Sequence, residues 1–237
     1  MAYQRMLGKR RRGGSYGSSK KRRSMGRRMK RRRSRSSRPY SKIMRQPVPD
    51  KMFTKLKYTE AISFGSLTGL TLSHYTFRNS IFDPDVTAVG HQPLWRDQLF
   101  LLYTRYRVHG IKYRFTIWNQ NQPAGLIGAV KHSDDGITET SWTTLRERRS
   151  VRSFVVSGPG AKQSVVKGYM ACGKPHGLTK KEFMFDEDFE ADMNSNPVKQ
   201  TYLQLYLTTQ GPTAVANVVV DMLYYVELTG RSSVSGS

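Results

Sequence analysis

Residues 108–118 read VHGIKYRFTIW, and they carry the clearest strand pattern in the chain. Its apolar and aromatic residues occupy every second position: Ile111, Tyr113, Phe115 and Ile117. Lys112, Arg114 and Thr116 stand between them. Successive side chains of a β-strand point to opposite faces, so a period of two predicts a strand with one buried face. We therefore predict a strand over residues 107–121.

Similar short runs of β-branched and aromatic residues recur on both sides of this strand, broken by Gly, Pro, Asn and Asp. Seven of them predict strands: 53–64, 69–79, 126–132, 151–157, 163–172, 200–209 and 215–228. In the first, the expected core face carries Leu56, Tyr58, Ile62 and Phe64; in the second, Leu70, Leu72 and His74. Three- and four-residue spacing predicts a helix over 95–106, 142–149 suits a short helical turn, and 180–196 has the composition of an acidic surface loop.

Eight short strands in one domain indicate a sandwich or barrel. Several connections are too long for hairpins, so we expect an all-β, eight-stranded jelly-roll sandwich. The expected organisation is a disordered basic arm over 1–45, a linker over 46–51, the jelly-roll domain over 52–230, and a flexible tail over 231–237.

Charge is concentrated at the N-terminal end. The 237-residue chain has a formal net charge of +23, and residues 1–45 hold 19 of its 40 Lys and Arg with no acid. The remaining 21 basic residues face 17 acids, so the body is near neutral. A segment this charged and this poor in aliphatic residues cannot bury enough apolar surface to fold. We expect it to be disordered and to bind a polyanion.

Nucleic acid is the polyanion that best suits the arm, because Arg pairs bidentately with phosphate and displaces condensed counterions. Nothing in the arm suits base edges, so binding should be largely independent of sequence. The same clusters are typical of nuclear localisation signals. The predicted nucleic-acid-binding residues are Arg10, Arg11, Arg12, Lys20, Lys21, Arg22, Arg23, Arg27, Arg28, Lys30, Arg31, Arg32, Arg33, Arg35 and Arg38.

The body offers further candidates. Its arginines could form a second basic surface: Arg105, Arg107, Arg114, Arg146, Arg148, Arg149 and Arg152. Tyr202 and Tyr206 share one face of a strand and could touch nucleic acid, although core or subunit contact is the favoured interpretation.

We expect no catalysis, no cofactor and no metal. His91, near Asp83, Asp85 and Asp97, is better explained as a loop histidine that hydrogen-bonds its own loop. Cys172 and His176 are four residues apart with no second pair, which argues against zinc. There is no phosphate-binding Gly-x-x-x-x-Gly-Lys-Ser/Thr loop and no Gly-x-Ser-x-Gly motif. With one Cys, no membrane-length apolar run and no apolar segment after the basic start, we expect a protein of the cytosol or nucleus.

One stretch is more specific. Residues 79–121 contain Asp83-Pro84, Gly90-His91-Gln92-Pro93, Asp97-Gln98, Leu102-Tyr103, Tyr106-Arg107-Val108 and Gly110, in that order. This string resembles the capsid proteins of circovirus-like, circular Rep-encoding single-stranded DNA viruses. The resemblance implies a jelly roll that assembles into an icosahedral shell of sixty copies around single-stranded DNA, found in the virion and the host nucleus, with import receptors as partners. It leaves the host attachment factor unknown.

Two other classes stay open. One is a cellular nucleic-acid-binding protein with a basic tail, although such proteins usually spread basic residues over their folded surface. The other is the capsid of a small RNA virus, since the arm alone cannot distinguish DNA from RNA. A cupin-like enzyme with a targeting tail is disfavoured, because no His-x-His ligand pair occurs.

Overall fold

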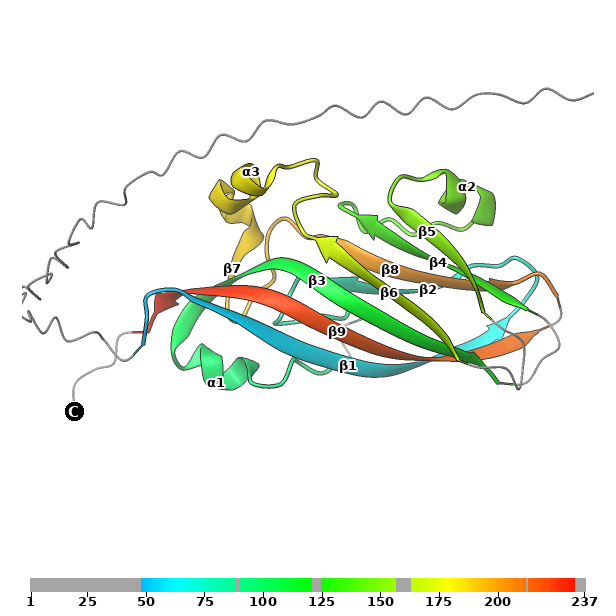
Figure 1. Ribbon diagram of the computed structural model, residues 1–237, viewed down its shortest axis with the longest axis horizontal. Helices are drawn as coiled ribbons and strands as arrows, with labels where there is room; N and C mark the ends of the chain where they lie inside the picture. The colour runs from blue at the N-terminus through cyan, green and yellow to red at the C-terminus, as the bar shows by residue number, and fades with distance from the viewer. Residues whose placement is uncertain (1–47, 88–89, 121–124, 157–162, 212, 233–237) are drawn as a thin grey trace, which may run out of the picture. The chain divides into compact units, whose positions relative to one another are not determined.

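The computed structural model describes residues 48–87, 90–120, 125–156, 163–211 and 213–232. These residues form two antiparallel β-sheets packed face to face (Figure 1). The first sheet has the order β1-β9-β3-β6, with the short β7 paired to β3. Its strands are β1 (Met52–Leu67), β9 (Ala214–Arg231), β3 (Tyr103–Asn119), β6 (Ser164–Ala171) and β7 (Glu190–Asp192).

The second sheet has the order β2-β8-β4-β5. Its strands are β2 (Ser73–Arg78), β8 (Tyr202–Thr209), β4 (Leu126–Ser133) and β5 (Val151–Val156). Setting the short β7 aside, the pairs are nested: the first strand pairs with the last (β1 with β9), then β2 with β8, β3 with β6, and β4 with β5. Rolling one long hairpin of this kind into two sheets gives a jelly roll, so the expected fold class is confirmed.

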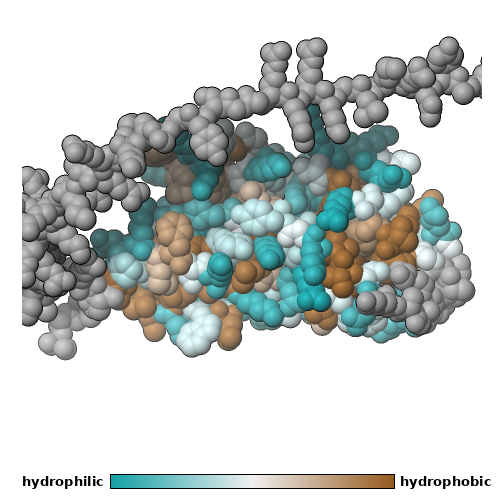
Figure 2. Space-filling model, in the orientation of Figure 1, coloured by the Kyte–Doolittle hydropathy of each residue, from teal (hydrophilic) through white to brown (hydrophobic). Residues whose placement is uncertain are grey.

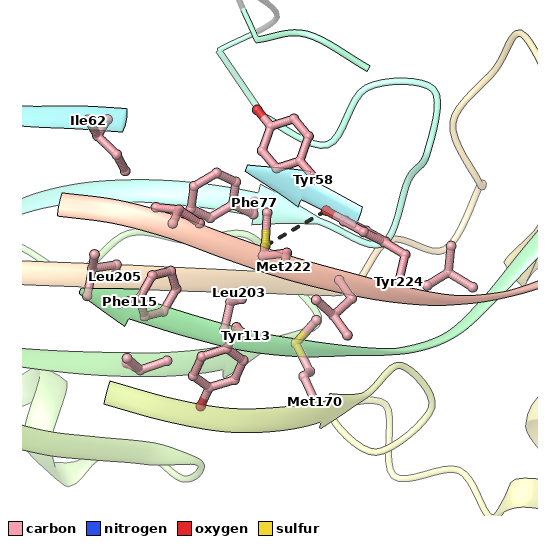
Figure 3. Close-up of a cluster of buried hydrophobic side chains, with 14 of the residues drawn as sticks. Tyr58, Ile62, Phe77, Tyr113, Phe115, Met170, Leu203, Leu205, Met222 and Tyr224 are labelled. Carbon is pink, nitrogen blue, oxygen red and sulfur yellow. Dashed lines mark hydrogen bonds between the residues drawn. The ribbon is translucent and has the colours of Figure 1, made fainter. Parts of the chain in front are cut away.

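The core lies between the sheets. Phe77 and Leu205 of one sheet face Phe115 and Met222 of the other, and all four are fully or almost fully buried (Figure 3). The rings of Phe77 and Phe115 are stacked across the sandwich, with centroids 6.4 Å apart. The alternation predicted for residues 108–118 is confirmed, because Ile111, Tyr113, Phe115 and Ile117 are buried while Lys112 and Arg114 are exposed.

The helix predicted over 95–106 is largely wrong. Only α1 (Arg96–Phe100) is helical, and the chain enters β3 at Tyr103. Tyr103 and Tyr106 are fully buried and pair with β9. The three-residue spacing of these tyrosines suggested a helix, but two aromatic residues three apart can also both be buried in a strand. Here the backbone hydrogen bonds to the neighbouring strands outweigh the local preference for a helix.

The second predicted strand presents its other face to the core. Phe77 is fully buried and Tyr75 packs against the core, whereas Leu70 is 49% exposed and His74 is also exposed. Leu72 instead joins a small cluster around Tyr206 on the far side of the second sheet, next to α2 (Trp142–Glu147). A second, minor apolar cluster therefore explains the leucine in the predicted pattern.

The stretch 180–196 is not a simple surface loop. It folds into α3 (Lys180–Phe185), a 3₁₀ turn η1 (Glu187–Phe189) and β7. Thr179 and Glu182 form a reciprocal capping box at the start of α3. Phe183 and Phe189 are buried against each other, 4.7 Å between centroids. These two aromatic anchors hold an otherwise acidic segment in place.

Candidate nucleic-acid interface

The fifteen predicted arm residues, Arg10 to Arg38, lie outside the described residues, so their role stays a prediction. The described body nevertheless carries a basic surface of its own. It is the face of the first sheet that points away from the second sheet. We call it the basic sheet face and define it by two rows of side chains that run across the four strands.

Strand register defines the two rows. One row runs Lys57, Leu223, Lys112, Tyr169 and the next runs Thr59, Asp221, Arg114, Lys167. These eight positions hold four basic residues and one acid. Asp221 is partly neutralised by Lys57, whose Nζ lies 3.2 Å from its carboxylate. The rows therefore present a net positive strip that suits a phosphate backbone.

Two aromatic side chains lie beside these charges: Tyr169 ends the first row, and Tyr225 lies in the neighbouring row next to Lys55. Tyr169 and Tyr225 meet edge to face with centroids 5.9 Å apart, and Lys55 Nζ lies 5.4 Å above the Tyr225 ring. The Tyr169 hydroxyl adds no negative charge, because tyrosine is neutral at pH 7 and burial raises the pKa of this one further. Alternating cations and aromatic rings is the arrangement that binds single-stranded nucleic acid, because bases stack on rings while phosphates pair with cations.

The face ends in a groove where α3 stands beside the sheet. The groove has a volume of about 1020 Å³. Its lining includes Phe53, His109, Tyr169, Phe183 and Tyr225. Arg107 fixes α3 as one wall, because its guanidinium donates to the carbonyls of Phe183 at 2.8 Å and Met184 at 2.6 Å.

The body arginines predicted from sequence do not form one surface. Arg114 lies on the basic sheet face, but Arg107 is buried under α3. Arg105 is 3.6 Å from Asp192 of β7, and Arg152 donates to the carbonyl of Lys167. Arg146, Arg148 and Arg149 belong to α2 and the residues just after it, beside the second sheet.

Tyr206 is fully buried, but in the small cluster on the far side of the second sheet rather than between the sheets, and its hydroxyl accepts from the backbone N–H of Glu139 at 3.1 Å. Tyr202 is half-buried, and its hydroxyl donates to Gln200 at 3.1 Å. Neither lies on the basic sheet face.

His91 performs the structural task expected from sequence. Its Nδ1 lies 2.9 Å from the Gln92 carbonyl and its Nε2 lies 2.7 Å from the Thr59 carbonyl. The ring also packs on Tyr58 with centroids 4.6 Å apart. These contacts tie the loop to β1. The two carbonyls raise the pKa of His91, because only the protonated ring donates to both.

The acids around His91 are occupied elsewhere. Asp83 pairs with Arg78, Asp85 accepts from Tyr75 at 2.9 Å, and Asp97 pairs with Arg96 at 2.8 Å. Cys172 is fully buried, which raises the pKa of its thiol, and His176 contacts the carbonyl of Gln200 at 3.2 Å. Among the described residues, no group of three or more His, Cys, Asp and Glu could hold a metal ion.

A second feature of the surface is apolar. Around α1, Leu94, Trp95 and Leu101 are 73%, 65% and 73% exposed, and we call these three residues the α1 apolar patch. Figure 2 shows brown and pale side chains at the lower left of the body, where Figure 1 places α1. Arg96, a buried residue of α1, anchors the helix by donating to the carbonyl of Met193 and to the side-chain oxygen of Asn194. Exposed apolar patches of this kind usually mark protein–protein contacts.

In the part of the chain that the structure describes, no helix is long and apolar enough to cross a membrane.

Comparison with protein-family models and with curated proteins gave no match. Solved structures similar to this chain include three viral proteins. The matched chain of Desmodium yellow mottle tymovirus is 16% identical in sequence, with a TM-score of 0.41; the match covers 81% of the present chain and 96% of the tymovirus chain. The decameric BFDV capsid protein is 12% identical with a TM-score of 0.48, covering 75% and 99%. Cocksfoot mottle virus is 14% identical with a TM-score of 0.44, covering 77% and 97%.

Sequence reasoning missed most of the basic sheet face. The sequence identified Lys112 and Arg114 as residues on the polar face of a predicted strand. Lys57 and Lys167 belong to strands far away in the sequence, so no local pattern connects them with this face. Only the register of β1, β9, β3 and β6 places these four cations in adjacent rows. The α1 apolar patch was hidden by the prediction of a longer helix over residues 95–106.

Proposed function

We propose that this chain is the coat protein of a small non-enveloped virus, in which the jelly roll forms the shell and the basic arm packages the genome. The observation that carries the proposal is the division of charge within one chain. An acid-free segment with 19 basic residues precedes a near-neutral jelly roll. Binding of nucleic acid by the arm and formation of a shell by the body would explain this division.

Packaging follows from electrostatics. Each arm neutralises phosphates and releases counterions, and the basic sheet face adds further cations. In a shell of sixty copies, the arms bring on the order of a thousand positive charges, enough to offset a similar order of phosphates. Because these contacts are to phosphate, packaging should depend on polymer charge rather than on sequence.

Assembly requires surfaces that bind other copies of the chain. The α1 apolar patch is one candidate, because burying its leucines and tryptophan on a neighbouring subunit would remove apolar area from water. Sixty subunits, a single-stranded circular DNA genome, delivery to the host nucleus and recognition by import receptors are the finer parts of the proposal. They are supported by the motifs of residues 79–121 and by the clustered Lys and Arg of the arm.

The experiment is negative-stain microscopy of the expressed full-length protein, with absorbance at 260 and 280 nm measured on the same fraction. Uniform spherical particles with a nucleic-acid-rich ratio are expected. Deleting residues 1–45 should leave folded protein that still forms shells but loses the nucleic acid. Monomers that bind nucleic acid without forming shells would refute the capsid assignment and favour a basic-tailed binding protein. Digesting the extracted cargo with DNase and RNase separates DNA from RNA.

A further inference from the structure

The groove between α3 and the sheet has the composition of a ligand site. Aromatic rings come from four strands and one helix: Phe53 of β1, His109 of β3, Tyr169 of β6, Tyr225 of β9 and Phe183 of α3. Its volume of about 1020 Å³ lies just above the range of small-molecule pockets, about 300–1,000 Å³. A mostly apolar recess of this size suits a flat aromatic ligand.

The rings form two contacting groups, one of Phe53, His109 and Phe183 and one of Tyr169 and Tyr225. The ring centroids of Phe53 and His109 are 5.7 Å apart, and those of His109 and Phe183 are 5.8 Å apart in an edge-to-face arrangement. The Tyr169 ring lies over Gly110, and a Cβ atom placed on Gly110 would be only 2.3 Å from the Tyr169 hydroxyl oxygen. The absence of a side chain at Gly110 therefore lets the tyrosine ring lie over the sheet while remaining 54% exposed.

The charges around the groove select an anion. Lys55, Lys174 and Lys180 line it and are exposed, and none of the described lining residues is acidic. Two carboxylates near the lining already have partners: buried Glu227 contacts Lys51 at 3.2 Å and His109 at 2.9 Å, and Glu182 of α3 accepts from the backbone N–H of Thr179 at 2.8 Å. An aromatic recess ringed by cations matches a ligand that is both flat and negatively charged.

The groove is continuous with the basic sheet face. Tyr169 belongs both to the groove and to the row that contains Lys57 and Lys112, and Arg114 and Lys167 occupy the next row. A polyanion that follows these rows therefore reaches the groove without crossing an acidic surface other than Asp221, which pairs with Lys57.

We propose that this groove binds an unpaired base of single-stranded nucleic acid, which stacks on Tyr169 and Tyr225 while the flanking phosphates pair with Lys55, Lys174 and Lys180. The site deepens the proposed function and rests on it, since it assumes that the chain binds nucleic acid. It differs from the arm in kind, because the arm is expected to bind mainly through phosphates whereas the groove also binds the base. Binding at the groove should therefore require a base but not a particular one.

The test uses full-length protein and two decamers of equal charge, a thymidine decamer and a decamer of abasic sites. The variant Tyr169→Leu/Tyr225→Leu removes both stacking rings, and Phe185→Leu removes an exposed aromatic that does not line the groove. Stacking of one base contributes about 1–3 kcal/mol, which is about 5- to 150-fold in affinity. At high salt, which weakens the phosphate contacts of the arm, we expect the double variant to bind the thymidine decamer at least about fivefold more weakly than wild type and the abasic decamer equally well.

A second measurement locates the base directly. A decamer containing 5-iododeoxyuridine is photo-cross-linked to the wild-type protein, and the peptides are identified by mass spectrometry. Cross-links to Tyr169, Tyr225 or Phe53 support the groove. Cross-links confined to other segments, together with equal affinities for the wild type and the double variant, overturn it while leaving nucleic-acid binding by the chain intact. Failure of the wild type to bind either decamer overturns both the groove and the proposed function.

Discussion

His132 should make the body lose stability in mild acid. The side chain lies in β4, half-buried, with its Nε2 3.2 Å from the Tyr113 hydroxyl and its ring edge-on to the Tyr113 ring. Burial, and secondly the positive charge of Lys174, lower its pKa from 6.5 to about 4. The folded protein therefore holds His132 neutral at a pH where the unfolded chain protonates it.

The sign and size of the effect follow from proton linkage. Between pH 6.5 and pH 4 the unfolded state binds more protons at this site than the folded state, so the free energy of unfolding falls as the pH falls. The stability that comes from burying His132 in its neutral form is fully present above pH 6.5. The loss reaches about 2 kcal/mol at pH 5 and about 3 kcal/mol at pH 4, from 1.36 kcal/mol per pKa unit.

The measurement is urea unfolding of the wild type and of His132→Gln at pH 7.5, 6 and 5, followed by tryptophan fluorescence on protein shown by sedimentation to be unassembled. The glutamine keeps a hydrogen-bonding group but does not titrate, so the wild type should lose about 2 kcal/mol more than the variant between pH 7.5 and 5. His91→Gln is the matched control. The pKa of His91 is raised, so its contribution is present at low pH and is lost as the pH rises. Equal losses in the wild type and His132→Gln would refute the buried, neutral histidine.

Three further changes test the core, a buried ion pair and the assembly surface. Phe115→Ala removes a fully buried ring that stacks on Phe77 and should lower the free energy of unfolding by about 3–5 kcal/mol in urea titrations; a loss below about 1 kcal/mol would contradict the packing. Glu139→Ala leaves the buried Lys131 ammonium without its carboxylate, 3.3 Å away, and should cost about 3–5 kcal/mol, whereas an unchanged midpoint would mean that Lys131 is solvated. Leu101→Asp places a charge in the α1 apolar patch and should abolish the particles seen by microscopy without changing the unfolding midpoint. Val198→Asp, at a position 81% exposed outside the patch, is the control, and normal particles from Leu101→Asp would exclude the patch from assembly.

Much of the fold could be predicted from local patterns. The alternation from Ile111 to Ile117 and the run of 200–209 identified strands because a period of two is a property of the extended backbone itself. All eight predicted strands exist, and their nested pairing gives the expected jelly roll. The predictions failed where local and tertiary forces disagree. The spacing of Tyr103 and Tyr106 is compatible with a helix, but pairing with β9 makes them part of a strand.

The candidate site divides in the same way. The sequence by itself determined the charge asymmetry between residues 1–45 and the body, because net charge does not depend on folding. Only the tertiary structure brought Lys57, Arg114 and Lys167 together and placed Tyr169 next to Tyr225 and α3. The physical reason is that strand order and register are set by the burial of whole sheet faces across long sequence separations. No local pattern records which strands become neighbours.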